Sequence, residues 1–310
     1  MKNFSIKALL FLLLQCSIGY ALMHRYQPTH PNHYIAATSA KEHRLATAPS
    51  PKIVLIGGSN LAFGPDSSEI SRVFGMPVVN MGLHGALLLD FHMNQTDGGL
   101  RKGDIIVISP EIHSSFTEKE SNWFQMQFMI EQDRSMIFHF SKDVLMDLSD
   151  MGLQYPNHVL RNRTFKPTPQ WPYTADSFNE VGDISALSDI FTAQEYQITN
   201  YRFVRYHASR AIQSVNAMTK RWEDRGVTVL FTWPSIWQEM YDRSPDQYDK
   251  LEEFAKTHLD TTPILGIKES LLPAEQFWNT PYHLNSRGRE SRTKLLIDAM
   301  RKHLVPVTKE

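Results

Sequence analysis

The chain has almost no cysteine, since Cys16 is the only one among 310 residues. A single cysteine excludes an intramolecular disulfide and any metal site built from several cysteines. The chain also lacks an excess of charge of one sign, because 32 Lys and Arg residues and 33 Asp and Glu residues leave a formal net charge of −1. No long run of like charge is present, so neither a charged tail nor a nucleic-acid partner is expected.

Two further patterns are missing from the chain. No segment repeats along its length, and no pair of histidines spaced i, i+4 comes with the glutamate of a zinc hydrolase. We therefore expect no metal and no other cofactor, and metal-dependent hydrolysis is a weak alternative. Hydrophobic residues make up 42% of the chain and aromatic residues 11%, which is enough to bury a sizeable core.

The N-terminus has the pattern of an export signal. Lys2 and Lys7 precede an apolar run over residues 8–23, which is short for a spanning helix. Gly19 and Ala21 form a small-x-small pair, so cleavage after Ala21 is one outcome and an uncleaved membrane anchor is the other. We expect the rest of the chain to be extracytoplasmic, either periplasmic or secreted. A buried N-terminal core helix is the alternative.

Residues 24–50 combine four histidines with Pro, Thr, Ala and Ser. The histidines have no regular ligand spacing, so a solvated linker is favoured over a metal-binding tract. Residues 51–305 then alternate between short apolar runs and amphipathic segments, which predicts an α/β domain with a mostly parallel sheet. Its first half has expected strands at residues 52–57, 76–82 and 103–109 and expected helices at 67–74 and 83–96.

The alternation breaks between about residues 112 and 193, which we interpret as an insertion that carries substrate contacts. An aromatic and methionine stripe over residues 123–140 favours helical core over an apolar binding wall. Residues 156–182 are rich in proline and predict an irregular loop or lid. The regular pattern then returns with expected helices at 194–225, 246–259 and 286–303 and expected strands at 227–233 and 263–266.

Ser59 follows the first apolar run directly, after Gly57 and Gly58. Glycine lets the backbone turn sharply there, and open α/β sheets bind ligands at the carboxyl ends of their strands. Ser59 Oγ is therefore expected to be exposed beside backbone N–H groups that can stabilise an oxyanion. A serine that only caps the next helix is the alternative.

A second polar cluster precedes the last expected helix. His283 lies between a proline-containing loop and the helix start, and histidine titrates in the range needed to take the proton of a serine. Asn285 or Ser286 is expected to cap the helix and so fix the loop. A structural histidine is the alternative, but together with Ser59 the pattern favours His283 as a general base.

Three motifs stand at the expected strand ends and in the last loop: Gly57-Gly58-Ser59-Asn60, Asn80-Met81-Gly82, and Tyr282-His283-Leu284-Asn285 with Gly288. With them the chain resembles the SGNH (GDSL-like) hydrolase superfamily, and within it the extracytoplasmic acyltransferases and esterases that modify cell-surface polysaccharides. The resemblance covers roughly residues 50–110 and 225–303 and implies a three-layer α/β/α sandwich. It also implies Ser59 as nucleophile, His283 as base, and oxyanion donors at Ser59, Asn60 and Gly82.

The chain departs from this family pattern at several positions. Gly58 stands where an Asp often precedes the nucleophile, and Ser109-Pro110-Glu111 replaces a Gly-x-Asn-Asp block. The acid that commonly orients the base would stand at Thr280. Asn279 beside it is expected to position the imidazole without supplying charge, which stabilises an imidazolium less than a carboxylate does. Glu111 and Glu275 are alternative sources of a carboxylate.

The function expected from these residues is an exported serine enzyme that transfers or hydrolyses an ester acyl group, expected to be acetyl, through an acyl-Ser59 intermediate. Its partners would be a carbohydrate substrate and an acyl donor, and an uncleaved segment over residues 8–23 would associate it with a membrane. Glu111, Tyr282 and Asn285 are expected to contact substrate. The alternative is a non-catalytic carbohydrate-binding or scaffold component of a polysaccharide assembly with a decayed site.

Overall fold

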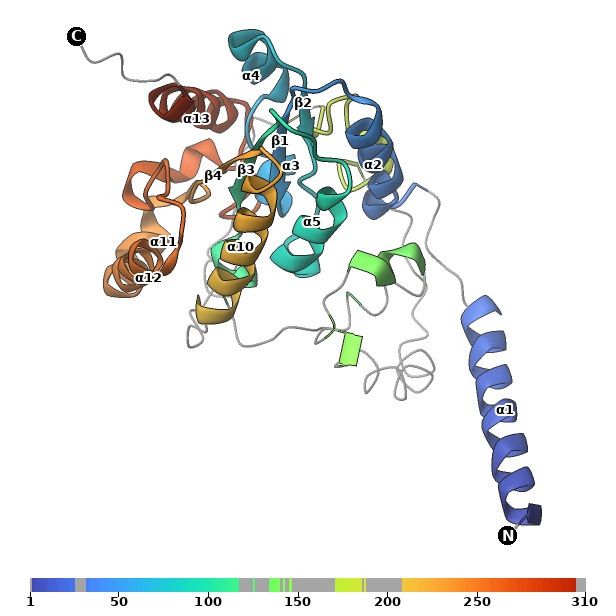
Figure 1. Ribbon diagram of the computed structural model, residues 1–310. Coiled ribbons are helices and arrows are strands. Elements are labelled where there is room, and N and C mark those ends of the chain that lie inside the picture. Colours follow the sequence, from blue (N-terminus) through green and yellow to red (C-terminus); the bar gives the residue numbers. More distant parts are fainter. Residues whose placement is uncertain are drawn as a thin grey trace.

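A four-stranded parallel sheet with the order β2-β1-β3-β4 lies at the centre of the protein (Figure 1). The computed structural model describes residues 2–25, 32–116, 125, 134–139, 142, 145–146, 171–185, 187 and 208–304. The strands of the sheet are β1 (Ile53–Gly57), β2 (Val78–Asn80), β3 (Ile105–Ser109) and β4 (Thr228–Phe231). The short strands β5 (Ile236–Trp237) and β6 (Leu271–Leu272) form a separate parallel pair.

Helices lie on both faces of this sheet. They are α2 (Ala37–Thr47), α3 (Ser59–Ala62), α4 (Ser67–Phe74), α5 (Leu88–Asp97), α6 (Ile112–Ser115), α10 (Ala208–Glu223), α11 (Gln238–Arg243), α12 (Pro245–His258) and α13 (Ser286–Leu304). Short 3-10 turns include Tyr34–Ala36, Gly85–Leu87, Arg134–His139 and Ala274–Gln276.

The composition of β1 explains the layers. Its four aliphatic side chains are fully buried, and successive residues of a strand point to opposite faces of the sheet. Val54 and Ile56 pack in one cluster with α2, α5 and α10, whereas Ile53 and Leu55 pack in another with α4 and α13. Burying each such side chain contributes roughly 1.5–3 kcal/mol. The predicted α/β/α sandwich is confirmed.

The prediction of a solvated linker over residues 24–50 is wrong for the part that the structure describes. Tyr34 and Ile35 are buried, and α2 packs Leu45 into the core. Lys41 is also buried, and its Nζ donates to Asn80 O at 2.8 Å and to Gly182 O at 2.6 Å. These backbone acceptors lie far along the chain, so the composition of residues 24–50 does not reveal them.

Two other element predictions need revision. Residues 263–266 form only a single parallel bridge between Phe231 and Pro263, not a strand. The predicted helix 194–225 is described from Ala208 onward, and its first part lies outside the described residues. Most of the aromatic stripe over residues 123–140 lies outside them as well, so its interpretation as core stays a prediction.

The N-terminal helix α1 (Lys2–Arg25) extends away from the sheet domain in Figure 1. The aliphatic side chains over residues 9–14 face solvent, with Leu9, Leu12 and Leu14 each more than half exposed. Among the helices described, none combines the length and the apolar character needed to cross a membrane.

Candidate active site

The sheet topology brings Ser59 and Glu111 together. In the sheet order β2-β1-β3-β4, the chain passes from β1 to its neighbour β2 on one side and then to β3 on the other side of β1. Where the direction of the connections changes in this way, a crevice opens at the carboxyl ends of the strands. Gly57 at the end of β1 is in register with Ser109 at the end of β3. The residues two positions further on, Ser59 and Glu111, therefore meet, and Ser59 Oγ lies 2.7 Å from Glu111 Oε1.

His283 completes the group from the loop before α13. Its Nε2 lies 2.8 Å from Ser59 Oγ. The loop is fixed by backbone hydrogen bonds, since His283 N–H donates to Thr280 Oγ1 at 3.0 Å and Trp278 N–H donates to His283 O at 2.8 Å. The imidazole also stacks on Phe63, with ring centres 4.1 Å apart. The two residues expected to form a nucleophile and base pair therefore lie within hydrogen-bond distance.

Asn279 orients the imidazole from the opposite side. Its Nδ2 donates to Tyr173 OH at 2.6 Å, which leaves Oδ1, at 2.9 Å from His283 Nδ1, to accept a hydrogen bond. Nδ1 then carries the hydrogen and Nε2 has a lone pair directed at Ser59. Glu111 contacts Ser59 rather than Nδ1, and Glu275 contributes only its backbone oxygen to Asn285. Neither alternative carboxylate therefore contacts Nδ1.

Burial is the main cause that lowers the pKa of His283 to about 3, and the electrostatic effect of nearby His84 is the smaller one. The imidazole is therefore neutral at neutral pH, as a group that accepts a proton must be. No carboxylate contacts Nδ1, so an imidazolium formed during a reaction would rely on Asn279 Oδ1 and on the Tyr173 hydroxyl, which lies 3.4 Å from Nδ1.

Glu111 is buried and accepts the hydrogen bonds that Ser59 and Asn60 direct into the crevice. Asn60 N–H lies 3.1 Å from its Oε1, and Ser59 N–H also bonds to the carboxyl. Glu111 was expected to contact substrate. The structure instead places it against the nucleophile candidate, in the space toward which these two backbone N–H groups point.

The expected oxyanion donors are therefore only partly available. Gly82 N–H donates to Asn80 Oδ1 at 2.8 Å, so this prediction is wrong for the conformation seen. The Asn60 amide does not face the crevice either, because its Nδ2 donates to Ser109 O at 3.1 Å. The backbone N–H groups of Ser59 and Asn60 do face the crevice, and both donate hydrogen bonds to the Glu111 carboxyl.

Two residues that were expected to contact substrate are buried and structural. Tyr282 is 2% exposed, and its hydroxyl accepts a hydrogen bond from the His113 backbone N–H at 3.3 Å. Asn285 is 1% exposed and accepts from Gly288 N–H at 3.0 Å. The expected capping role of Asn285 is confirmed, whereas the substrate contacts of Tyr282 and Asn285 stay predictions that this burial does not support.

Residues 171–185 contribute to the site in a way that the sequence did not indicate. Tyr173 bonds to Asn279, as described above, and Asp183 anchors the segment. The Asp183 carboxylate accepts from Ser67 Oγ at 2.6 Å and from Asn80 Nδ2 at 2.7 Å. The proline-rich composition predicted a loop but carried no signal for these contacts.

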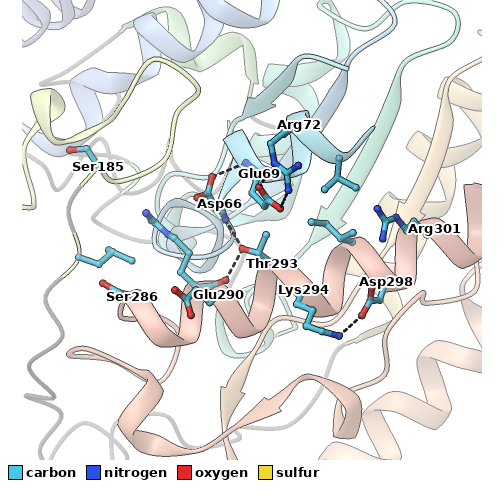
Figure 2. A pocket seen from close by; sticks show the side chains of 14 residues that line it. Asp66, Glu69, Arg72, Ser185, Ser286, Glu290, Thr293, Lys294, Asp298 and Arg301 are labelled. Carbon is cyan, nitrogen blue, oxygen red and sulfur yellow. Dashed lines mark hydrogen bonds and ion pairs between the residues drawn. The ribbon is translucent and has the colours of Figure 1, made fainter. Parts of the chain in front are cut away.

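A separate hollow of about 750 Å³ lies between α4 and α13 (Figure 2). Four of its charged side chains form two ion pairs, Arg72 with Glu69 and Lys294 with Asp298. Ser59, Glu111 and His283 do not line it. In the described ranges, no three His, Cys, Asp or Glu side chains are grouped to hold a metal ion.

Acid is expected to destabilise the fold because four histidines, His92 and His283 buried and His84 and His113 half-buried, are held in the neutral form. Burial lowers the pKa of His84, His92 and His113 to about 4 and that of His283 to about 3, from an ordinary 6.5. Below pH 6.5 the unfolded chain binds protons that the folded chain does not, so the free energy of unfolding falls as pH falls toward 4.

We expect each histidine to contribute on the order of 1 kcal/mol to this loss between pH 7.5 and 5.0. Glu111 and Asp183 act in the opposite direction, because burial raises the pKa of each and the folded state then binds the extra proton. Urea unfolding at both pH values measures the balance. Equal or greater stability at pH 5.0 would contradict the prediction.

No protein-family model matches this chain, and no curated protein is similar enough to match it.

Proposed function

We propose that this protein is an exported serine acyltransferase or esterase that forms an acyl-Ser59 intermediate. The observation that supports the proposal is the linear arrangement of Ser59 Oγ, His283 and Asn279, with successive contacts of 2.8 and 2.9 Å. A nucleophile bonded to a base that a third group orients is the recurring arrangement of covalent acyl transfer.

The reaction follows from these contacts. Ser59 Oγ attacks the carbonyl carbon of an ester while His283 Nε2 takes its proton, and the carbonyl oxygen becomes an oxyanion. When the bond to the leaving alcohol breaks, the alcohol takes the proton from His283. Water or an acceptor hydroxyl then attacks acyl-Ser59 by the same steps in reverse, which gives hydrolysis or transfer.

We propose an acetyl ester on a cell-surface or extracellular carbohydrate as the substrate class, in keeping with the resemblance to polysaccharide-modifying SGNH-like enzymes. The aromatic rings around His283 support a ligand site there, because such rings supply apolar contact area. The Tyr173 ring stacks on that of Trp278, with ring centres 6.0 Å apart, and Tyr173 is 37% exposed.

Export is part of the same proposal. The lysines at the start of α1 and its exposed aliphatic residues fit a signal segment or anchor over residues 8–23. The acyl donor and the carbohydrate would then meet the enzyme outside the cytoplasm, in the periplasm or after secretion.

Covalent labelling tests the proposal. A fluorophosphonate probe should modify the wild-type protein stoichiometrically and should not modify Ser59→Ala, as read from intact mass and the labelled peptide. Ser286→Ala, on the separate hollow of Figure 2, is the matched control and should label like the wild type. Equal labelling of Ser59→Ala would remove Ser59 from the mechanism. A folded wild type that does not label would favour a non-catalytic carbohydrate-binding or scaffold role.

A further inference from the structure

The carboxyl group of Glu111 sits in a slot that two glycines leave open. A Cβ atom on Gly58 would lie 2.5 Å from Glu111 Oε1, and one on Gly85 would lie 2.0 Å from Oε2. Any side chain at either position would displace the carboxyl. Its contact of 2.7 Å with Ser59 Oγ is therefore a built feature of the crevice.

The hydrogen bonds around Ser59 require one proton more than a carboxylate and a neutral imidazole provide. Ser59 has a single hydroxyl hydrogen, yet both Glu111 Oε1 and His283 Nε2 lie within 2.8 Å of its oxygen. Nδ1 of His283 donates to Asn279, so Nε2 of the neutral ring can only accept. If Ser59 donates to His283, the contact with Glu111 is satisfied only when Glu111 itself carries a hydrogen.

The surroundings of Glu111 favour this neutral form. Burial raises the pKa of its carboxyl, more than hydrogen bonds from Ser59, Asn60 and Ser114 lower it. The titratable groups around it are His283 across Ser59, Tyr34 in the turn before α2, and the histidines that flank Gly85 and begin α6, His84 and His113.

None of these neighbours supplies a positive charge at neutral pH. Burial raises the pKa of the Tyr34 hydroxyl and lowers that of each histidine, so all four groups are neutral. Within the described part of the chain, no lysine or arginine is among the groups that shift the pKa of Glu111. Burial without a nearby cation shifts a carboxyl toward its neutral form.

We propose that Glu111 is a further catalytic residue, a neutral carboxylic acid that donates a hydrogen bond to the oxyanion formed at Ser59. The inference rests on the proposed acyl transfer. As Oγ bonds to the carbonyl carbon and its proton moves to His283, the electron pair of the C=O bond moves to the carbonyl oxygen. Glu111 keeps its proton throughout and shifts its hydrogen bond from Oγ to that oxygen, beside the N–H groups of Ser59 and Asn60.

Two substitutions of Glu111 distinguish a hydrogen-bond donor to the oxyanion from a carboxylate that only supports the structure. Glu111→Gln keeps the size and supplies an amide N–H, so we expect kcat/KM for an acetyl ester within about tenfold of wild type. Glu111→Ala removes the donor, and we expect a loss of about 10²–10³-fold. Both variants should keep the wild-type circular dichroism spectrum and should still label at Ser59. A Gln variant as slow as the Ala variant would overturn the donor role.

The pH profile and infrared spectroscopy test the proton directly. Wild-type kcat/KM should fall on the alkaline side as Glu111 ionises, and Glu111→Gln should lack that fall because an amide does not ionise. In the resting protein at neutral pH, a carbonyl stretch of a neutral carboxylic acid should be present and should be lost in Glu111→Gln. Absence of that band overturns the inference. If the carboxylic acid band is present but the protein neither reacts with the probe nor converts ester, the proposed function and the donor role are both wrong. The neutral state of Glu111 would still stand.

Discussion

Replacing His283 with glutamine is expected to lower kcat/KM for an acetyl ester by roughly 10²–10⁴-fold, the usual contribution of general acid–base catalysis. The imidazole Nε2 lies 2.8 Å from Ser59 Oγ, and an amide placed there cannot take the hydroxyl proton at neutral pH. The substituted side chain still fills the space against Phe63, so the fold should be retained. Steady-state kinetics at saturating and limiting ester concentration measure the effect.

His303→Gln is the matched control for this substitution. His303 lies exposed near the end of α13, where its ring bonds to Ala299 O, and it is remote in the chain from the loop of His283. We expect wild-type kinetics from it. If His283→Gln and His303→Gln turned over the ester equally well, His283 would not be the base.

Removal of the Asp104 carboxylate is expected to lower the free energy of unfolding by about 3–5 kcal/mol, the usual loss when one partner of a buried ion pair is deleted. Asp104 is fully buried with Lys52, and its Oδ2 lies 3.3 Å from Lys52 Nζ. Its oxygens also accept from the backbone N–H groups of Lys52 at 3.0 Å and Arg101 at 2.9 Å. Asp104→Ala therefore leaves two backbone donors without partners and a buried ammonium whose remaining hydrogen bond is to Ser50 Oγ at 3.3 Å.

Urea unfolding of three variants checks this reasoning. Asp298→Ala removes an exposed carboxylate from a pair with Lys294 and should leave the unfolding midpoint unchanged. The double variant Lys52→Met with Asp104→Leu removes both charges and should recover much of the stability lost in Asp104→Ala. An Asp104→Ala midpoint equal to that of Asp298→Ala would show that the buried pair is not needed.

The central part of the fold could be predicted from the sequence because its signals are local. The expected helix over residues 67–74 coincides with α4, which begins after an Asp66 cap and ends at Gly75 with φ of +63°. Residues 32–50 could not be predicted in this way. Lys41 is buried there because two carbonyl oxygens, at Asn80 and Gly182, accept from its ammonium.

The site was predicted in part for the same reason. Ser59 and His283 stand in short motifs beside strand and helix boundaries, and the structure places them in contact. The position of Glu111 depends on the register of β1 with β3, which pairs Gly57 with Ser109, and no local pattern encodes that pairing. The hydrogen bond from Gly82 N–H to the Asn80 side chain likewise depends on how the backbone turns after β2, which the sequence does not show.

The distance along the chain between Ser59 and His283 has a consequence for biosynthesis. The two residues are 224 positions apart, and Asn279 and Glu111 come from further separate segments. A growing polypeptide that has released Ser59 from the ribosome has no base to activate it until almost the whole chain has been made. If the protein is the exported serine enzyme proposed above and crosses a membrane unfolded, its serine would become reactive only at the destination.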